Sequence, residues 1–397
     1  MNELYPNDLR SIINKIKALT QLGKMQEAEK LCVETLKNNM ESASLWTELG
    51  FLKELIYVDD RQAKECYKQA AKCGNPFAYF NIAVSCGKLG EYEEAEENFK
   101  KVLQIFPDDE DVNASYGMCL LKQRKFKEGY EYFYRRSRKL ENSTTKWWKP
   151  YQKLEDSLII YCDQGLGDHI QFIRYLPFLG ERKLIVKTHK SLKKLFSDNY
   201  PNIEFVGYDF EDNGWQHVRI TDLAFALGMD FEHIPLAEGY LNSETADIKN
   251  DKLKVGLCWE AGAAGIRNMI QRTINVKYFD SLMALDNIQV YSFQYTDTMG
   301  GNNRYPNLIN LAKDFNDFSD TARALKAMNV VITVDTSVAH LSGALGIKTF
   351  LLIPYVNDWR WFDDDKTTPW YKSVKIFKQT TPISWEEPIN EIIKLLK

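Results

Sequence analysis

The chain has 397 residues, which at roughly 100–200 residues per domain is enough for two to four domains. Hydrophobic residues make up 44% and charged residues 27%, an ordinary composition for a globular protein that buries its own core. The formal charge of −4, from 51 basic and 55 acidic side chains, argues against the basic surface typical of general nucleic-acid-binding domains. Seven cysteines without C-x-x-C spacing argue against a disulfide framework or a structural zinc site.

No targeting or membrane segment is predicted. The opening residues MNELYPNDLR lack an apolar signal core, and no apolar run approaches the roughly 20 residues needed to span a bilayer. Reduced thiols fit a cytoplasmic protein better than a secreted one. We therefore expect a cytoplasmic, multidomain protein without a membrane span.

Residues 1–140 are predicted to be almost entirely helical and to repeat. Small residues stand 35, 32 and 34 residues apart, each four residues before a larger side chain: Ala28 before Cys32, Ala63 before Tyr67, Ala95 before Phe99 and Gly129 before Phe133. A small residue lets two helices approach, and the larger one fills the gap toward the next repeat. This pattern resembles the tetratricopeptide repeat (TPR). Such arrays commonly hold peptides or partner proteins on a concave face; alternatively, the array only supports the remainder of the chain.

The end of the array is basic. Residues 122–139 hold eight lysines and arginines, which could meet an anionic partner or form a solvated face. Residues 141–156 are polar, contain Pro150 and break the helical period, so they are predicted to be a linker.

From residue 157 onward short apolar runs alternate with helical stretches. The predicted strands are 157–162, 183–188, 203–208, 254–259, 288–293, 330–335, 348–354 and 374–377. Continuous apolar strands of this kind favour parallel sheets covered on both sides. The polar stretch 242–252 divides them into a Rossmann-like half at 157–247 and another at 248–397, which ends in a helix. Two doubly wound halves would bind a ligand at the carboxyl ends of their strands.

The first cluster of candidate functional residues follows the first of these strands. Gly165 and Gly167 allow a tight turn, and Asp168 begins a helix with an apolar face. Asp168 is placed either to cap that helix or to act as a general base. His169 beside it could act as a base near neutral pH or be ordinary polar surface.

Two further clusters follow strands of the second half. Residues 259–273 join a Gly/Ala-rich segment, whose backbone N–H groups can cradle phosphates, to Arg267 and Arg272, which can clamp a diphosphate. The alternative is a flexible loop with two surface arginines. In residues 330–346 a strand runs into Asp335, Thr336 and Ser337 at the start of a helix that carries His340. This arrangement indicates an anion site, and an ordinary capped helix is the alternative.

Three segments carry a family resemblance. QGLGDHIQFIRYLPFL resembles the opening strand–turn–helix of heptosyltransferase-type glycosyltransferases, with a G-D pair, an apolar helix and L-P. VDTSVAHLSGALG resembles the nucleotide-sugar segment of the same family, and YVNDWRW followed by PWY is similar to a subgroup that places TPRs before this domain. The likeness covers residues 157–380. It implies a GT-B arrangement with the donor nucleotide mainly in the second half, the acceptor over the first, inversion at the anomeric carbon, and no required metal.

Carried over by position, the resemblance makes Asp168 the general base. His169 stands where the family more often has a small residue, so a role in acceptor choice is open. Arg272 falls where heptosyltransferases have a donor-phosphate lysine, which keeps the charge but changes the geometry. The candidate donor contacts are Gly165, Gly167, Trp259, Arg267, Arg272, Gln294, Asp335, Thr336, Ser337 and His340.

The sequence therefore predicts an α + α/β protein: TPR-like helical repeats (1–140), a linker (141–156) and a GT-B type pair of Rossmann-like doubly wound domains. We expect an inverting, metal-independent glycosyltransferase with a nucleotide sugar as co-substrate and no cofactor. Its acceptor is expected to be a protein or peptide on the repeat array, because the array directly precedes the expected transferase part and the first half of that part is short. Two alternatives stay open: a glycosyltransferase for a modified nucleic-acid base or a glycan, and a catalytically silent TPR scaffold.

Overall fold

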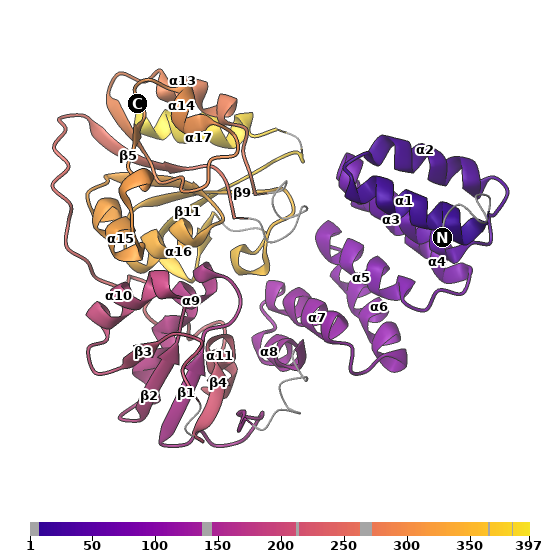
Figure 1. Cartoon of the computed structure of the whole chain (residues 1–397), viewed down its shortest axis with the longest axis horizontal. Helices are drawn as coiled ribbons and strands as arrows, with labels where there is room; N and C mark the ends of the chain where they lie inside the picture. Colours follow the sequence, from indigo (N-terminus) through magenta and orange to yellow (C-terminus); the bar gives the residue numbers. More distant parts are fainter. Residues whose placement is uncertain (1–7, 137–144, 212–213, 263–271, 364–365, 383) are drawn as a thin grey trace. The chain divides into compact units, whose positions relative to one another are not determined.

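The computed structural model describes residues 8–136, 145–211, 214–262, 272–363, 366–382 and 384–397 (Figure 1). The chain divides into two compact units. A repeat unit comprises residues 1–123 and 132–138, and an α/β unit comprises residues 124–131 and 139–397. All seven cysteines are free thiols.

The N-terminal helices follow one another in pairs (indigo to purple in Figure 1), and the last of them, α8, is divided between the two units. The pairs are α1 (Leu9–Gln21) with α2 (Met25–Leu36), α3 (Ala43–Tyr57) with α4 (Asp60–Lys72), α5 (Ala78–Leu89) with α6 (Tyr92–Ile105), and α7 (Glu110–Lys122) with α8 (Phe126–Tyr134). Side-chain oxygens of Ser42, Asp59 and Asp109 cap α3, α4 and α7, as expected for helix starts in water.

The predicted alternation of small and large residues forms the core of this unit. Ala63 and Ala95 are fully buried in one apolar cluster with Phe99 and Tyr116. The rings of Phe99 and Tyr116 stack with centroids 5.1 Å apart, which joins α6 to α7. The helical-repeat part of the fold prediction is therefore confirmed.

The first half of the α/β unit is a four-stranded parallel sheet in the order β3-β2-β1-β4. Its helices α9 and α10 follow β1 and β2. A cluster of Ile159, Ile185 and Val206 packs against Phe210 and Trp215 from the β3–β4 connection, so loop side chains contribute to covering the sheet. The elements are β1 (Ser157–Tyr161), α9 (Leu166–Phe172), η2 (Ile173–Leu179), β2 (Lys183–Lys187), α10 (Lys190–Asn199), β3 (Glu204–Val206), β4 (Gln216–Arg219), η3 (Ile220–Asp222) and α11 (Leu223–Ala226).

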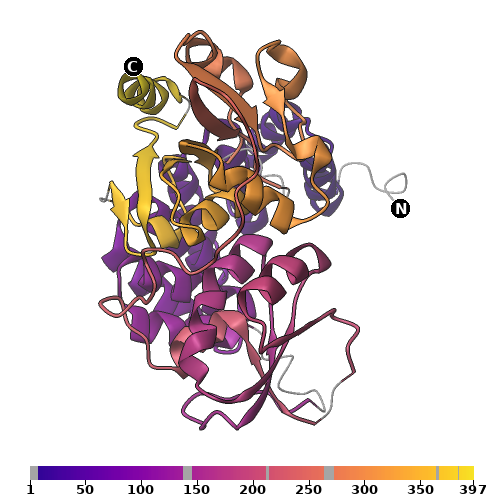
Figure 2. The same ribbon diagram turned by 90° about the vertical axis from the view of Figure 1, so that its left-hand side faces the viewer.

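The second half is a seven-stranded sheet in the order β10-β11-β9-β8-β5-β6-β7, parallel except for the edge strand β10. The closing helix α17 (yellow in Figure 2) buries Ile389, Ile392 and Leu396 in the core of this half. The elements are β5 (Leu253–Cys258), η4 (Val276–Phe279), α13 (Asp280–Met283), β6 (Ile288–Ser292), α14 (Gly301–Arg304), β7 (Ile309–Asn310), η5 (Ala312–Asp314), α15 (Phe318–Lys326), β8 (Val330–Val334), α16 (Ser337–Ala344), β9 (Thr349–Ile353), η6 (Trp359–Trp361), β10 (Thr367–Thr368), β11 (Tyr371–Lys378) and α17 (Glu386–Leu396).

The strand orders locate the binding edges. In the first sheet β1 lies between β2 and β4, and in the second β5 lies between β6 and β8, so the chain starts in the middle of each sheet and later returns to the other side. Such a reversal opens a crevice outside the carboxyl ends of the two adjacent strands, where open α/β sheets bind ligands. This topology confirms the prediction of two Rossmann-like halves.

The boundary between the units differs from the predicted linker. Residues 124–131, the start of α8, belong with the α/β unit, because the ring of Phe126 stacks on Trp370 at 6.0 Å and meets Phe231 edge-on at 5.5 Å. The helical period of the sequence predicts this segment to lie wholly in the repeats. Its helical pattern is the same in either location, so periodicity does not distinguish them.

Two helix-interior glycines provide a test of packing in the repeat unit. A β-carbon at Gly50 would lie 2.5 Å from Cε1 of Tyr67, whereas one at Gly87 would lie 3.7 Å from Sγ of Cys119. Because alanine is favoured over glycine in helices by about 1 kcal/mol, we expect Gly87→Ala to be neutral or stabilising. Gly50→Ala should instead lower the free energy of unfolding by about 1–3 kcal/mol, because it overpacks the interface. Urea unfolding followed by circular dichroism measures both; equal changes would contradict the close α3–α4 approach.

Candidate functional site

The carboxyl edge of the first sheet presents Asp168. Gly165 is the N-cap of α9 in an extended conformation (φ −86°, ψ 167°). Asp168, the third residue of the helix, turns back so that its Oδ2 accepts a hydrogen bond from the Gly165 N–H at 3.0 Å. The capping interpretation of Asp168 thus accounts for one carboxylate oxygen, and Oδ1 has a different partner.

The carboxyl edge of the second sheet presents the start of α16. Thr336 is the N-cap, since its Oγ1 accepts a hydrogen bond from the Val338 N–H at 3.2 Å, and Ser337 is the first helical residue. Asp335, immediately before the cap, is 5% exposed. The first turn of a helix carries partial positive charge and N–H donors, so this edge suits an anion.

His340 lies one turn into α16 as a neutral ring. Its Nδ1 is 2.9 Å from the Tyr371 hydroxyl, and the ring stacks on Trp361 with centroids 5.3 Å apart and 30° between the planes. Burial lowers the pKa of His340 to about 3, and Arg360 nearby also disfavours its protonation. Since its Nε2 lies 4.0 Å from Asp335 Oδ1, His340 can supply hydrogen bonds beside this carboxylate but no positive charge.

Arg360 joins these two edges. From η6 of the second half, its Nη2 forms an ion pair with Asp168 Oδ1, and its Nε donates to Gln171 Oε1 of α9 at 2.7 Å. Its Nη1 pairs with Asp358 Oδ1 at 2.8 Å within the second half. The predicted base of one half is therefore held by a guanidinium of the other.

Two further contacts fix the approach of the halves. A β-carbon at Gly167 would lie 2.7 Å from Cδ2 of His340, so the Gly-x-Gly turn permits α9 to lie directly against α16. Arg174, which is fully buried, donates from Nη1 to the carbonyl of Trp370 at 2.9 Å and from Nη2 to the Tyr240 hydroxyl at 3.3 Å. Sequence reasoning assigned no role to either arginine, because their partners are distant in the chain. Both stand within the motifs QGLGDHIQFIRYLPFL and YVNDWRW, which were the only signal for them.

The carboxylates of the site differ in how readily they ionise. Burial raises the pKa of Asp168 from its ordinary range, with Arg360 opposing the rise. Burial, together with the neighbouring Asp358, raises the pKa of Asp335 to about 6, against the attraction of Arg272 and Arg360. For Asp358, the direct pairing with Arg360 outweighs burial and lowers the pKa. Carboxyl groups with perturbed pKa values in a cleft are typical of functional sites.

Arg272 is the described arginine of the Gly/Ala-rich segment. Its Nη1 lies 3.7 Å from Asp335 Oδ2 and donates to the Asp335 carbonyl at 3.4 Å. The side chain is 27% exposed, so it lies partly open to solvent at the edge of the second sheet. Arg267 and the centre of this segment, residues 263–271, lie outside the described residues.

The structure does not bring His169 to the ion-pair cluster. His169 is 1% exposed, its Nδ1 lies 3.3 Å from the Thr188 hydroxyl, and burial lowers its pKa to about 4. A ring of this kind stays neutral and enclosed in the first half. This environment argues against the expected role as a base.

Trp259 and Gln294 also belong to the scaffold rather than to an open surface. Trp259 is 1% exposed in the core of the second half, with Gly301 directly against its ring. The Gln294 Oε1 accepts the N–H groups of Trp259 and Glu260 at 3.0 and 2.9 Å, and its Nε2 donates to the carbonyls of Glu260 and Thr296 at 3.1 and 2.7 Å. These bonds use both amide hydrogens, so direct donor contact through Gln294 is not supported. Its amide instead fixes the loop after β5.

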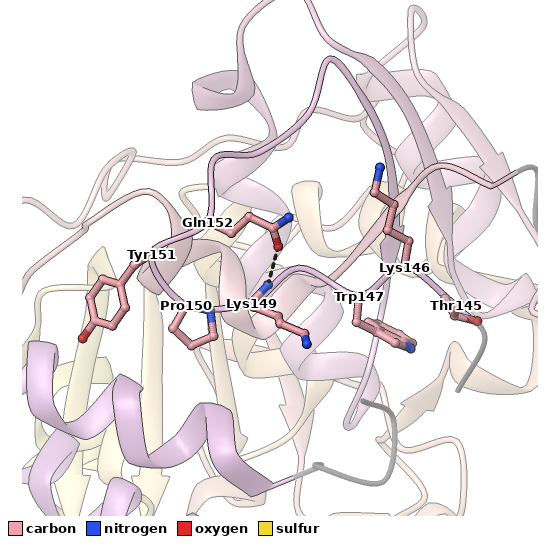
Figure 3. Close-up of a pocket in the computed structure, with 7 residues that line it drawn as sticks. All are labelled: Thr145, Lys146, Trp147, Lys149, Pro150, Tyr151 and Gln152. Atoms are coloured by element: carbon pink, nitrogen blue, oxygen red, sulfur yellow. Dashed lines mark hydrogen bonds between the residues drawn. The ribbon is translucent and has the colours of Figure 1, made fainter. Parts of the chain in front are cut away.

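A cavity of about 610 Å³ lies elsewhere in the α/β unit (Figure 3). It is lined by Thr145, Lys146, Trp147, Lys149, Pro150, Tyr151 and Gln152. The Gln152 Oε1 accepts a hydrogen bond from the Lys149 N–H at 3.2 Å, which closes this turn of the predicted linker. None of the predicted site residues lines it.

Comparisons with known proteins show similarity in sequence and in fold. Residues 76–109 match the tetratricopeptide repeat family model. Protein FlbA of Caulobacter vibrioides is 23% identical over 445 residues, covering 99% of this chain and 73% of that protein. The crystal structure of the glycosyl transferase family 9 from Veillonella parvula DSM 2008 is 12% identical with a TM-score of 0.45, covering 62% of this chain and 98% of that chain.

The repeats also resemble solved structures. A thermophilic TPR protein of Thermus thermophilus is 14% identical with a TM-score of 0.33, over 36% of this chain and 79% of that chain. The family-model match shows that the N-terminal part of the chain contains a tetratricopeptide repeat at residues 76–109.

Across the described residues, no helix combines the length and apolar character required to cross a membrane.

The raised pKa of Asp335 predicts a pH-dependent stability. A carboxyl whose pKa rises from 3.8 to about 6 on folding contributes stability below about pH 4 that is lost as the pH rises through 6. We therefore expect Asp335→Asn to raise the melting temperature at pH 8, with a much smaller difference at pH 4. Thermal unfolding at pH 4, 6 and 8 measures this.

Asp280→Asn is the matched control. Hydrogen bonds from Tyr305 and Arg304 lower the pKa of Asp280, so its removal should decrease, not increase, the melting temperature at pH 8. A lower melting temperature for Asp335→Asn at pH 8 would contradict the assignment of Asp335 as a carboxylate that folding disfavours.

Proposed function

We propose that this protein is an inverting glycosyltransferase that moves a sugar from a nucleotide-sugar donor to an acceptor hydroxyl, in a GT-B arrangement. The observation that carries the proposal is the ion pair between Asp168 on α9 of the first half and Arg360 of the second half. The second half also carries Arg272 beside Asp335, directly before the N-terminus of α16, and α9 lies against α16 where Gly167 meets His340. In this proposal one half supplies the general base and the other half supplies the anion site.

The donor is bound by the second half. Arg272 and the first turn of α16 are placed to neutralise a diphosphate, because a guanidinium and helix N–H groups both donate to phosphate oxygens. Asp335 and the neutral His340 supply acceptors and donors for sugar hydroxyls. Because these cationic groups can stabilise the leaving nucleoside diphosphate, the proposal includes no metal.

The first half supplies the base. Asp168 takes the proton from the acceptor hydroxyl as its oxygen attacks the anomeric carbon, and the bond from that carbon to the diphosphate oxygen breaks. Burial, which raises the pKa of Asp168, makes its carboxylate a stronger base than an exposed aspartate.

Three variants distinguish the general base from the donor site. Asp168→Asn keeps the shape of the side chain and one acceptor oxygen for the helix cap but removes its basicity, so donor binding should persist while transfer falls about 100-fold or more. Arg272→Ala and Asp335→Ala should abolish thermal stabilisation by the donor while leaving the fold intact. Thermal shift with a panel of uridine, guanosine, adenosine and cytidine nucleotide sugars, followed by single-turnover transfer, measures both. Near-normal transfer by Asp168→Asn would remove Asp168 from the mechanism.

The acceptor is a protein or peptide bound by the repeat array. The TPR match at residues 76–109 supports this, as does the exposure of apolar side chains on α3, where Phe51 is 42% and Tyr57 51% exposed. Binding the acceptor on the same chain that carries the transferase raises its effective concentration at the base without any new catalytic group.

The basic stretch 122–139 does not favour nucleic acid as the acceptor. The guanidinium of Arg124 lies 4.9 and 5.0 Å from the ring centroids of Phe231 and Phe362, and Arg136 is 8% exposed with Nη1 donating to the Phe133 carbonyl at 2.7 Å. These cations are engaged within the protein. Arg138 and Lys139 lie outside the described residues.

A substitution on α3 tests acceptor binding. Phe51→Ala removes an exposed aromatic ring from the first helix of a pair, whereas Ile105→Ala removes a 50% exposed side chain from α6, the second helix of another. We expect Phe51→Ala to raise the KM for a protein acceptor about tenfold and to leave donor hydrolysis unchanged, with Ile105→Ala as the unaffected control. Transfer of radiolabelled sugar to protease-sensitive cell material measures this. Equal transfer by both variants would argue against acceptor binding at α3.

A further inference from the structure

Arg360 directs all three of its nitrogens to side chains that come from both halves. Nε and Nη2 contact Gln171 and Asp168 of α9, and Nη1 contacts Asp358, the N-cap of η6. Its side chain is 12% exposed, compared with 19% for Asp168 and 33% for Asp358. The guanidinium is thus a buried link, with its donors engaged by protein side chains.

The geometry on α9 suits a planar fork. Asp168 and Gln171 are three residues apart and therefore lie on one face of the helix. A guanidinium presents donors at fixed angles and can hold both side chains at once, whereas an ammonium is a point charge. Arg360 therefore fixes the orientation of the Asp168 carboxylate as well as its distance from the second half.

The charges around Asp168 give Arg360 a second effect. Asp358 from η6 and Asp163 from the turn after β1 both disfavour a further negative charge, and so does burial. The Gly165 N–H favours the charge, and His340, whose ring lies against Gly167, is neutral. Among the groups around Asp168, Arg360 is the one that lowers its pKa most, against the rise caused by burial.

We propose that Arg360 is a positioning residue for sugar transfer, whose guanidinium holds the Asp168 carboxylate and the Gln171 side chain of α9 in a fixed orientation. Its positive charge also favours the ionised form of Asp168. The proposal rests on the proposed function, in which Asp168 is the base. It adds a residue of the donor half that acts on the acceptor half. The competing role, direct binding of the donor diphosphate, would require the guanidinium to exchange its present partners.

The experiment compares full-length Arg360→Gln, Arg360→Lys and the parent. Arg304→Gln is the matched control, since Arg304 also pairs with an aspartate, Asp280, but is 45% exposed and belongs to α14. Rates of transfer are measured from pH 5 to 9, and KM is measured for the nucleotide sugar that stabilises the parent in thermal shift. Binding of the corresponding nucleoside diphosphate is measured separately.

A base must lose its proton to act, so transfer falls as the pH drops through the pKa of Asp168. Removing the positive charge in Arg360→Gln should raise that pKa. The acid limb, meaning the part of the pH–rate profile where transfer falls at low pH, should therefore move upward by about 1 pH unit or more. Arg360→Lys should leave the limb near that of the parent but lower kcat about tenfold, because the charge remains and the fork is lost. Nucleoside diphosphate affinity should change less than threefold in both, and Arg304→Gln should match the parent throughout.

An unmoved acid limb together with a large loss of nucleoside diphosphate affinity would overturn the proposal and make Arg360 a donor ligand. If Arg360→Gln does not fold, Arg360→Lys decides, because unchanged kcat in that variant excludes a requirement for the fork. If the parent transfers no sugar, the proposed function fails, whereas the link itself is still measured by a double-mutant cycle of melting temperatures. Additive effects of Asp168→Asn and Arg360→Lys in that cycle would overturn the link.

Discussion

The ion pair between Arg360 and Asp168 is the interaction on which the candidate site depends. Asp168 of the first half and Asp358 of the second half pair with the same guanidinium, and Asp335 is close enough to interact electrostatically with Asp358 and Arg360. Without a cation, desolvated carboxylates of this kind would repel one another. The guanidinium of Arg360 contacts Asp168 and Asp358 at once and has the shape to hold them in a defined geometry.

The backbone of α9 permits the ion pair between Arg360 and Asp168. Gly167 lacks the side chain that would collide with His340, and the start of α9 can therefore approach α16. Arg174 also holds the two halves together. It donates hydrogen bonds to the carbonyl groups of Pro235 and Trp370 and not to carboxylates, so it does not neutralise the acidic side chains of the site. The result is a cluster in which positive charge comes from arginines while the buried His340 stays neutral.

The local hydrophobic pattern of the sequence predicts most of the strands. The eight apolar runs correspond to β1, β2, β3, β5, β6, β8, β9 and β11, because buried parallel strands must be apolar along their length. The strand β4, QHVR, is not predicted, because it is an edge strand of the first sheet whose polar and charged side chains form no apolar run, although all four residues are buried. Residues whose neighbours are local, such as Asp168, Thr336 and Asp335, were found as candidates. Arg360 was not found because its partners lie 189 and 192 residues away, and Trp259 and Gln294 follow strands yet serve the core.

The division of α8 has a consequence for how such proteins can be assembled from parts. Phe126, within residues 124–131, packs on Trp370 and Phe231 of the α/β unit, whereas Tyr132, later in the same helix, packs on Tyr116 of the repeats at 4.4 Å. Recombination that exchanged one repeat array for another at the predicted linker would remove side chains that belong to the core of the α/β unit. The viable crossover point lies before residue 124, so the incoming array must end in a helix whose first turns already suit its host.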